Sequence, residues 1–297
     1  MLNHLLNGVL PFFAIGALGF VLGKRGTFDL ATAMAINKFV MFVCMPALVF
    51  RLLARASLEE FDLAMLIGYL VTEIVMYVGG FVIGRYFFRV DVKEAVLLGL
   101  ALALTNHVLF VLPIATTLFG EDAVTPIIAI ISMDGILVFS GTIILMDVLT
   151  SRGTSFGFTV GKIVRNPPLI AMVLGLIFGV LNLTIPKGID VFLANLGGTA
   201  SPVLLFAIGV ILSQPRDGAG ILLPATITGM KLVVHPLLAF GIFSAMLSLA
   251  PQVLTSAMMV AAAPCGVMAF MLALNYGVRV DVIARAILFT SVGSLIH

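Results

Sequence analysis

Apolar runs of about 17 to 25 residues recur along the whole of this 297-residue chain, and that is the length a helix needs to cross a bilayer. Charged residues make up only 10% of the sequence, and the mean hydropathy is +1.23, so the chain lies outside the range of soluble proteins. We predict ten spans, at residues 8–24, 32–52, 62–84, 94–119, 124–147, 166–184, 191–213, 221–249, 253–276 and 281–297.

The segments between these spans are short, the longest being 148–165, and none is long enough to form a second domain. The first 13 residues lack a basic n-region and a small-residue cleavage site, so we expect no cleaved signal peptide. The sequence therefore predicts a single all-α, multi-pass membrane protein. A net charge of +2 without a basic tract gives no indication of nucleic-acid binding.

Lysine and arginine are unequally shared between the two sides that these spans define. The connections after odd-numbered spans hold ten of them: Lys24, Arg25, Arg85, Arg89, Lys93, Arg152, Lys162, Arg165, Arg216 and Arg279. The connections after even-numbered spans hold three: Arg51, Arg55 and Lys187. Because basic residues favour the cytoplasmic side, we expect the odd connections in the cytoplasm and both termini outside.

The chain also matches itself at an offset of 156 residues. Pro11, Leu18, Gly19 and Gly23 recur as Pro167, Leu174, Gly175 and Gly179, and "PALVF" from Pro46 returns as "PVLLF" from Pro202. The halves, residues 1–150 and 165–297, would each hold five spans. An odd number of crossings places the second half upside down, and such inverted repeats are typical of secondary transporters.

The fourth and ninth spans, one in each half, both carry a proline near their middle. Thr105, Asn106 and His107 precede Pro113 in the fourth span, and Pro264 follows three alanines in the ninth, at an offset of 151. A mid-helix proline removes a backbone hydrogen bond that no water replaces in hydrocarbon. A broken helix exposes N–H groups for an anion and carbonyls for a cation or proton carrier. We expect a substrate site where the two breaks meet; a simple kink in each helix is the alternative.

Four ionisable side chains fall near the middle of their spans: Glu73, Asp134, Lys231 and His235. A charge there costs about 2.5–3.5 kcal/mol, and such residues usually face the protein interior and pair. Glu73 and Lys231 hold nearly equivalent places in the two halves, which fits a structural ion pair or a proton-coupling pair equally well. We favour coupling for Asp134, because Gly135 would let another helix approach closely. His107 fits a coupling role or a purely hydrogen-bonding one.

Five stretches together resemble the auxin efflux carrier family: Asn106 seven residues before Pro113, "RNPPLIAMVLGLIFG" from Arg165, "SPVLLFAIGVIL" from Ser201, "KLVVHPLL" from Lys231 and "AAAPCGVMAFMLALNYG" from Ala261. The bacterial members of this family are described as permeases for malonate, malate or similar anions, and its plant members are the PIN carriers. The resemblance implies a bacterial inner-membrane location and ten helices. Spans one, two, six and seven would form a scaffold domain. The other spans would form a transport domain, with spans four and nine crossing at their prolines, and this domain would move like an elevator.

The resemblance also implies site residues. The family's span-four asparagine, which helps to hold a substrate carboxylate, matches Asn106, and its crossover prolines match Pro113 and Pro264. Where the family tends to have glycine, this chain has Val111 and Val108, which we expect to narrow the pocket and exclude an indole-sized substrate. The family's last helix usually continues beyond the position of His297. The candidate substrate-binding residues are Thr105, Asn106, His107, Phe110, Pro113, Pro264, Cys265 and Gly266.

These features predict a secondary transporter of a small organic carboxylate anion with elevator-type alternating access and proton coupling through Glu73, Asp134, Lys231 and His235. Sodium coupling is an alternative, because unwound backbone carbonyls can bind that ion. A passive channel is less favoured, because the sequence has no ring of like charges and no filter motif. An enzyme is disfavoured, because there is no H-E-x-x-H motif and no serine has an obvious base. We expect no cofactor and no metal, while the scaffold helices leave room for a homodimer.

Overall fold

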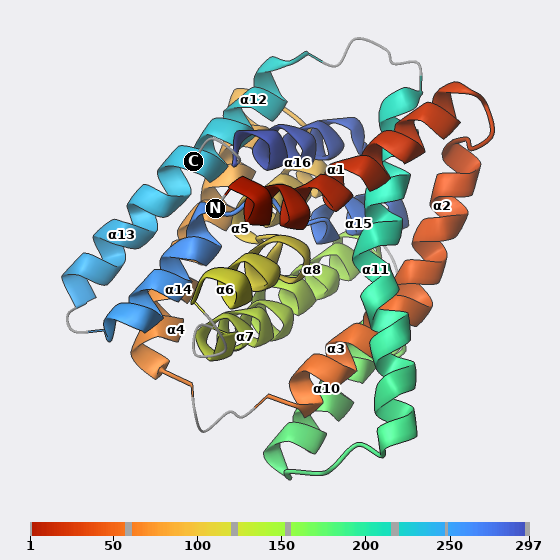
Figure 1. The fold of residues 1–297 in the computed structure, drawn as a ribbon. Helices are drawn as coiled ribbons and strands as arrows, with labels where there is room; N and C mark the ends of the chain where they lie inside the picture. The colour runs from red at the N-terminus through yellow and green to blue at the C-terminus, as the bar shows by residue number, and fades with distance from the viewer. Residues whose placement is uncertain are drawn as a thin grey trace.

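The computed structural model describes residues 2–56, 61–119, 124–151, 156–214, 220–246 and 249–294, and within these ranges it is helical without a strand (Figure 1). Five helices there are long and apolar enough to cross a membrane: Leu30–Ala54, Leu63–Phe87, Val124–Thr150, Lys187–Ser213 and Leu222–Ala245. The prediction of an all-helical chain rich in membrane-length helices is therefore confirmed. Arg152, Arg216 and the last three residues of the expected tenth span lie outside the described residues.

The first half of the chain contains helices that continue through short π-helical turns, marked η. Its elements are α1 (Leu2–Lys24), α2 (Leu30–Phe39), η1 (Val40–Cys44), α3 (Met45–Ala54), α4 (Leu63–Val82), η3 (Ile83–Phe87), α5 (Val92–Ala103), η4 (His107–Val111), α6 (Leu112–Phe119), α7 (Val124–Met133), η6 (Asp134–Phe139) and α8 (Ser140–Thr150). Such π-turns often mark functional sites in helical proteins.

The second half begins with a helix that we did not predict, α9 (Phe156–Val164), which lies in the expected connection 148–165. The remaining elements are α10 (Pro167–Val180), α11 (Lys187–Ser213), α12 (Leu222–Gly229), η7 (Met230–Val234), α13 (His235–Met246), α14 (Pro251–Ala262), α15 (Met268–Asn275) and α16 (Asp281–Gly293). The asparagine-proline pair at Asn166 and Pro167 separates α9 from α10, because proline suits the first turn of a helix and disfavours a helical residue before it.

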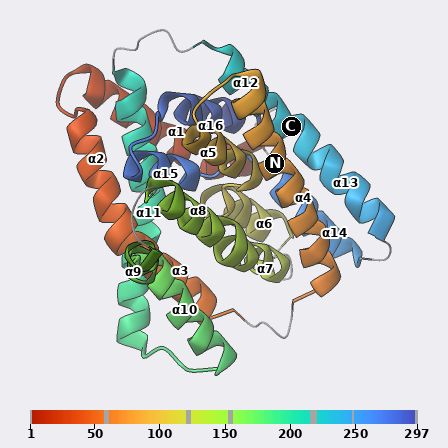
Figure 2. The same ribbon diagram turned by 180° about the vertical axis from the view of Figure 1, so that it is seen from behind.

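One group of helices consists of α2, α3, α10 and α11, which lie together on the same side of the molecule in both views, with α1 packed along α11 (Figures 1 and 2). Glycines allow close contacts here. A Cβ on Gly175 of α10 would lie 2.9 Å from the carbonyl oxygen of Phe50 in α3, and a Cβ on Gly19 of α1 would overlap the carbonyl oxygen of Phe206 in α11. The offset of 156 relates these two contacts, because Gly19 corresponds to Gly175 and Phe50 corresponds to Phe206.

The other helices form a second group centred on α5. All residues of α5 from Glu94 to Ala103 are buried, as expected for a helix that is apolar on nearly all sides. Glu94 sits at its first turn, where the Arg279 guanidinium donates to its carboxylate at 2.7 Å. The buried α5 therefore places its C-terminal end in the interior of the protein.

Two helical paths in this second group are interrupted inside the protein. α5 ends at Ala103 and the helix resumes at His107, while α14 ends at Ala262 and α15 begins at Met268. The backbone is extended at Leu104, with φ −62° and ψ 135°, and at Ala263, with φ −80° and ψ 162°. The predicted interruption of both helices is thus observed.

The two breaks pair with each other through their backbones. Thr105 and Cys265 form an isolated antiparallel bridge. The Asn106 N–H donates to the Pro264 carbonyl at 3.0 Å, and the Gly266 N–H donates to the Leu104 carbonyl at 3.0 Å. These bonds satisfy part of the backbone that the breaks release in a membrane interior.

The first break does not lie at Pro113, where we predicted it. In the first break, Thr105 lies two residues after the end of α5. In the second break, Pro264 lies two residues after the end of α14. Matching Pro113 with Pro264 at an offset of 151 was therefore wrong. Pro113 directly follows the π-helical turn and the first residue of α6, where the hydrogen-bond register changes and a missing N–H is tolerated. Its side chain lies outside those described.

Candidate functional site

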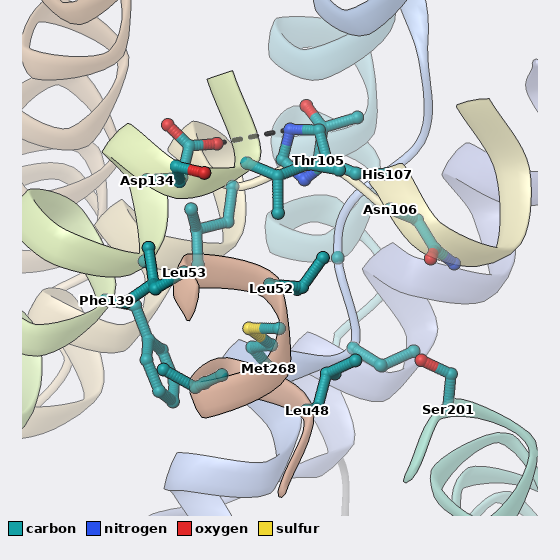
Figure 3. A pocket seen from close by; sticks show the side chains of 17 residues that line it. Leu48, Leu52, Leu53, Thr105, Asn106, His107, Asp134, Phe139, Ser201 and Met268 are labelled. Atoms are coloured by element: carbon teal, nitrogen blue, oxygen red, sulfur yellow. Dashed lines mark ion pairs between the residues drawn. The ribbon is translucent and has the colours of Figure 1, made fainter. Parts of the chain in front are cut away.

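A cavity lies where the two breaks face α3 and α11, and we call it the central cavity (Figure 3). Leu48, Leu52 and Leu53 of α3 form an apolar wall, opposite the polar residues of the first break. The volume is about 50 Å³, which is room for a few waters at roughly 10–15 Å³ each. The remaining lining residues are Val49, Leu104, Thr105, Asn106, His107, Ile131, Ser132, Asp134, Gly135, Phe139, Ser201, Gly266, Val267 and Met268.

The polar wall carries hydrogen-bonding groups that lack partners. The side-chain nitrogen Nδ2 of Asn106 is buried and has no hydrogen-bond partner in the described part of the chain. His107 Nε2 faces Asp134 Oδ2 at 3.1 Å, and both side chains are buried (Figure 3). A buried donor left unpaired costs about 1–3 kcal/mol, so a ligand with an acceptor oxygen would be favoured beside Asn106.

Lys231 explains what compensates the break after α5. This residue comes from η7 and is completely buried. Its ammonium Nζ donates to the carbonyls of Leu102 at 2.9 Å and Ala103 at 2.7 Å, and to Thr105 Oγ1 at 3.0 Å. The last carbonyls of a helix have no partner within the helix, and the negative end of the helix dipole favours a cation. Lys231 therefore acts as a cap for α5.

The expected ion pair of Glu73 with Lys231 is not among the ion pairs of the described residues. Glu73 lies on α4 and is completely buried, and neither of its carboxylate oxygens has a hydrogen-bond partner there. His235, at the start of α13, is buried in the same way, and its ring centroid lies 6.2 Å from that of Tyr69. Glu73 and Tyr69 of α4 and His235 of α13 do not line the central cavity.

The predicted residues of the second break have different positions. Gly266 lines the cavity, and a Cβ there would lie 2.8 Å from the Thr105 carbonyl oxygen, so only glycine fits without displacing the first break. Pro264 and Cys265 belong to the break but do not line the cavity. The Cys265 N–H donates to Thr290 Oγ1 at 3.2 Å, which ties the break to α16.

The expected roles of Phe110, Val111 and Gly135 in the pocket need correction. Phe110 and Val111 pack in an apolar cluster behind the cavity, so Val111 does not narrow it. The side chain of Val108 lies outside those described. Gly135 does line the cavity, but a Cβ there would meet no atom within 4 Å, so close helix approach is not its role.

Two polar lining residues, Ser132 and Ser201, and the leucine wall of α3 were not predicted from the sequence. Ser201 precedes Pro202 in the repeated stretch, which was the one available signal for it. Ser132 donates to the Ile128 carbonyl at 2.9 Å, within its own helix. Nothing in an apolar helix marks which of its leucines will face a cavity.

Comparisons with known proteins agree with the helical membrane fold. A family model described as "Membrane transport protein" matches residues 4–156 and 154–297. A protein of Rhizobium meliloti (strain 1021) named "Putative malonate transporter" is 26% identical over 298 residues, which cover 97% of this chain and 91% of that protein. A protein of Methanothermobacter thermautotrophicus named "Uncharacterized transporter" is 25% identical over 291 residues, which cover 97% and 94%. The chain is thus an integral membrane protein that belongs to the membrane transport protein family, the family of the auxin efflux carriers.

Proposed function

We propose that this protein is a secondary transporter that carries a small organic carboxylate anion across the membrane. The observation that carries the proposal is the meeting of two interrupted helices at a buried cavity with unpartnered polar groups. Asn106 Nδ2 and the free N–H groups at the start of η4 would bind the carboxylate, because a helix N-terminus attracts anions. The printed name of the Rhizobium relative fits this class of substrate.

The size and shape of the central cavity support a short carboxylate. A volume of about 50 Å³ fits a short carboxylate better than a substrate with an indole ring. The single methylene group of malonate, or the two of succinate, would contact Leu48 and Leu52, while the carboxylate ends would face the polar wall. Ser201 of α11 would reach the second carboxylate of a dicarboxylate.

The two walls of the cavity suggest how access alternates. We propose that spans one, two, six and seven, formed by α1, α2–α3, α10 and α11, are a scaffold, and that the remaining spans move against it like an elevator. The repeated glycine contacts of Gly19 with Phe206 and Gly175 with Phe50 support two inverted five-span repeats, residues 1–150 and 165–297. Such repeats place the substrate at their interface near the bilayer midplane. The scaffold would also be the surface for a homodimer.

We propose that transport is coupled to protons. A carboxylate substrate beside the Asp134 carboxylate would be repelled unless His107 or Asp134 carried a proton. Substrate and proton would then bind together, with Glu73 and His235 as a second pair of proton acceptors behind the break. Sodium coupling stays the alternative, although Lys231 already occupies the carbonyls that α5 releases. A passive anion channel is a further alternative that counterflow distinguishes.

The basic connections set the orientation that we propose. Both termini would lie outside and the odd-numbered connections in the cytoplasm of a cell whose plasma membrane holds the protein. Accessibility of single cysteines placed in these connections to an impermeant thiol reagent on intact cells tests this orientation.

Ligand-induced thermal stabilisation of the purified protein tests the proposed site. Malonate, succinate, acetate and indole-3-acetate are compared at pH 5.5 and 7.5, with and without sodium. A ligand at 100 times its Kd stabilises a protein by about 2.7 kcal/mol, a measurable rise in Tm. We expect malonate or succinate to stabilise the wild type and an Asn195→Ala control on the exposed surface of α11 fully, and to stabilise Asn106→Ala much less. Equal stabilisation of all three proteins would show that the site is wrongly placed.

A further inference from the structure

A second and larger cavity lies beside α9, and we call it the α9 cavity. Its volume is about 650 Å³, against about 50 Å³ for the central cavity on the same measure. Figure 2 shows α9 beside α10, and these helices meet α8 and the end of α15 at this place. The cavity thus opens between the proposed scaffold, which supplies η1 and the start of α10, and the proposed transport domain, which supplies α8 and α15.

The two cavities lie along the same three helical segments. α15 contributes Met268 to the central cavity and Asn275 to the α9 cavity, which are about 10 Å apart at 1.5 Å per residue. The path through α2, η1 and α3 and the path through η6 and α8 also contribute to both. Between the cavities these segments carry several buried apolar side chains: Cys44, Met45, Ile143, Met146, Met271 and Leu272. The two cavities thus lie on the same helical segments with buried apolar residues between them.

The α9 cavity carries a cation that has no acidic partner in the described part of the chain. Arg165 lines it and is exposed, and it appears in no hydrogen bond or ion pair there. Asn166 lies beside it with its side-chain oxygen buried and unpartnered. The acidic lining residue, Asp147, is 1% exposed, and its Oδ1 accepts a hydrogen bond from the Tyr276 hydroxyl at 2.9 Å. The accessible charge of this cavity is therefore positive.

We propose that the α9 cavity is an anion-binding vestibule in which Arg165 binds the carboxylate substrate before it passes to the central cavity. The inference rests on the proposed transport function. A guanidinium binds a carboxylate through two parallel hydrogen bonds, and a positive charge in a recess raises the local concentration of anions. The position of Arg165 after span five places this vestibule on the expected cytoplasmic side.

The electrostatic part of the proposal is tested by cysteine labelling, which does not depend on transport. A Cβ at Gly161 would meet no atom within 4 Å, so Gly161→Cys places a thiol in the α9 cavity without a clash. The full-length protein is labelled with an anionic and a cationic methanethiosulfonate, and the ratio of the two rates is measured. Adding Arg165→Gln should lower the anion-to-cation ratio about three- to tenfold, because one unit charge is removed within several ångströms. Gly188→Cys, at the start of α11, is the control and should show no change.

Substrate binding is tested by protection. Malonate should slow the labelling of Gly161→Cys even in an Asn106→Ala background, in which the central site is disabled. Protection should be lost with Arg165→Gln and kept with Arg165→Lys. The native thiols, Cys44 and Cys265, are buried. The labelling rate of the wild type, which carries only these two, is subtracted as background.

The outcomes separate this inference from the proposed function. The vestibule proposal is overturned if Arg165→Gln leaves the labelling ratio unchanged. It is also overturned if Arg165→Gln leaves the protection by malonate intact, or if malonate protects in none of the variants. If the vestibule results hold while Asn106→Ala still gains full thermal stability from malonate, the central site is wrongly placed and the vestibule stands.

Discussion

Replacing Gly266 with alanine should damage the crossing of the two breaks, and Gly135, which lines the same cavity, offers a control. The new Cβ would lie 2.8 Å from the Thr105 carbonyl oxygen, closer than real Cβ atoms come, and 3.2 Å from its carbonyl carbon, which is also tight. Both obstacles are backbone atoms, so the breaks must separate. Gly135→Ala adds the same methyl group to the same cavity, where nothing lies within 4 Å.

The size of the effect follows from known costs of overpacking. An added methyl group in a packed interior costs about 1–3 kcal/mol, so Gly266→Ala should lower the free energy of unfolding by this amount. Gly135→Ala should raise it by up to about 1 kcal/mol, because alanine is the better helix former. For a protein of this size each kcal/mol corresponds to a Tm change of about 2 °C.

Thermal unfolding with and without malonate measures both consequences. Because Asn106 directly follows Thr105, the displaced break should also weaken the stabilisation by malonate more in Gly266→Ala than in Gly135→Ala. The reasoning is refuted if the two alanine variants have the same Tm and the same response to malonate.

Three further predictions concern other parts of the protein. Lys231→Met should lower the free energy of unfolding by about 1–3 kcal/mol, because two buried carbonyls lose their hydrogen-bond donor. Removing a buried charge offsets only part of this loss. If Lys231→Met had the same Tm as the wild type, Lys231 would not act as a cap. Gly175→Ala, whose Cβ would meet the α3 backbone, should lower the Tm, while Gly198→Ala, with open space around it, should not. The Thr32 hydroxyl and N–H donate to the Asp29 carboxylate and lower its pKa. The ionised Asp29 therefore adds stability above its unfolded pKa of about 3.9, and this is lost as the pH falls through the folded value. The Tm advantage of wild type over Asp29→Asn should accordingly shrink between pH 6 and pH 3, and a constant difference would refute this.

The helical membrane fold was predictable because it depends on long-range averages. Apolar runs located the helices to within a few residues, as for α11, expected from residue 191 and found from Lys187. The short helix α9 escaped prediction, because a helix of nine residues that contains two glycines gives a weak signal. The exact offset of 156 also placed Gly19 and Gly175 in corresponding contacts, since both sites need a residue without a side chain.

The site was harder to predict, because it depends on contacts between residues that lie far apart in the sequence. Pro264 marked the second break correctly, since a residue before proline avoids the helical conformation. Pro113 was misleading, because a π-helical turn can accommodate a proline that does not break the helix. The break at Leu104 is fixed by pairing with the second break, and no local signal carries that pairing.

The partners of the buried charges were likewise not encoded locally. Lys231 was matched to Glu73 by symmetry, but the carbonyls released at the end of α5 took its hydrogen bonds instead. The contact between His107 and Asp134 joins two spans whose relative rotation no sequence period fixes. Buried polar groups could thus be named from the sequence, while their pairing required the structure.

Counterflow of labelled malonate into proteoliposomes tests the central claim most directly. Liposomes that contain the purified protein are loaded with unlabelled malonate or with buffer alone, and labelled malonate is added outside. A carrier with alternating access should take up label faster and to a transient excess in the loaded liposomes, and Asn106→Ala should abolish this excess. Equal uptake in loaded and empty liposomes would contradict alternating access. If the wild type took up neither malonate nor succinate, transport of a small carboxylate would be contradicted.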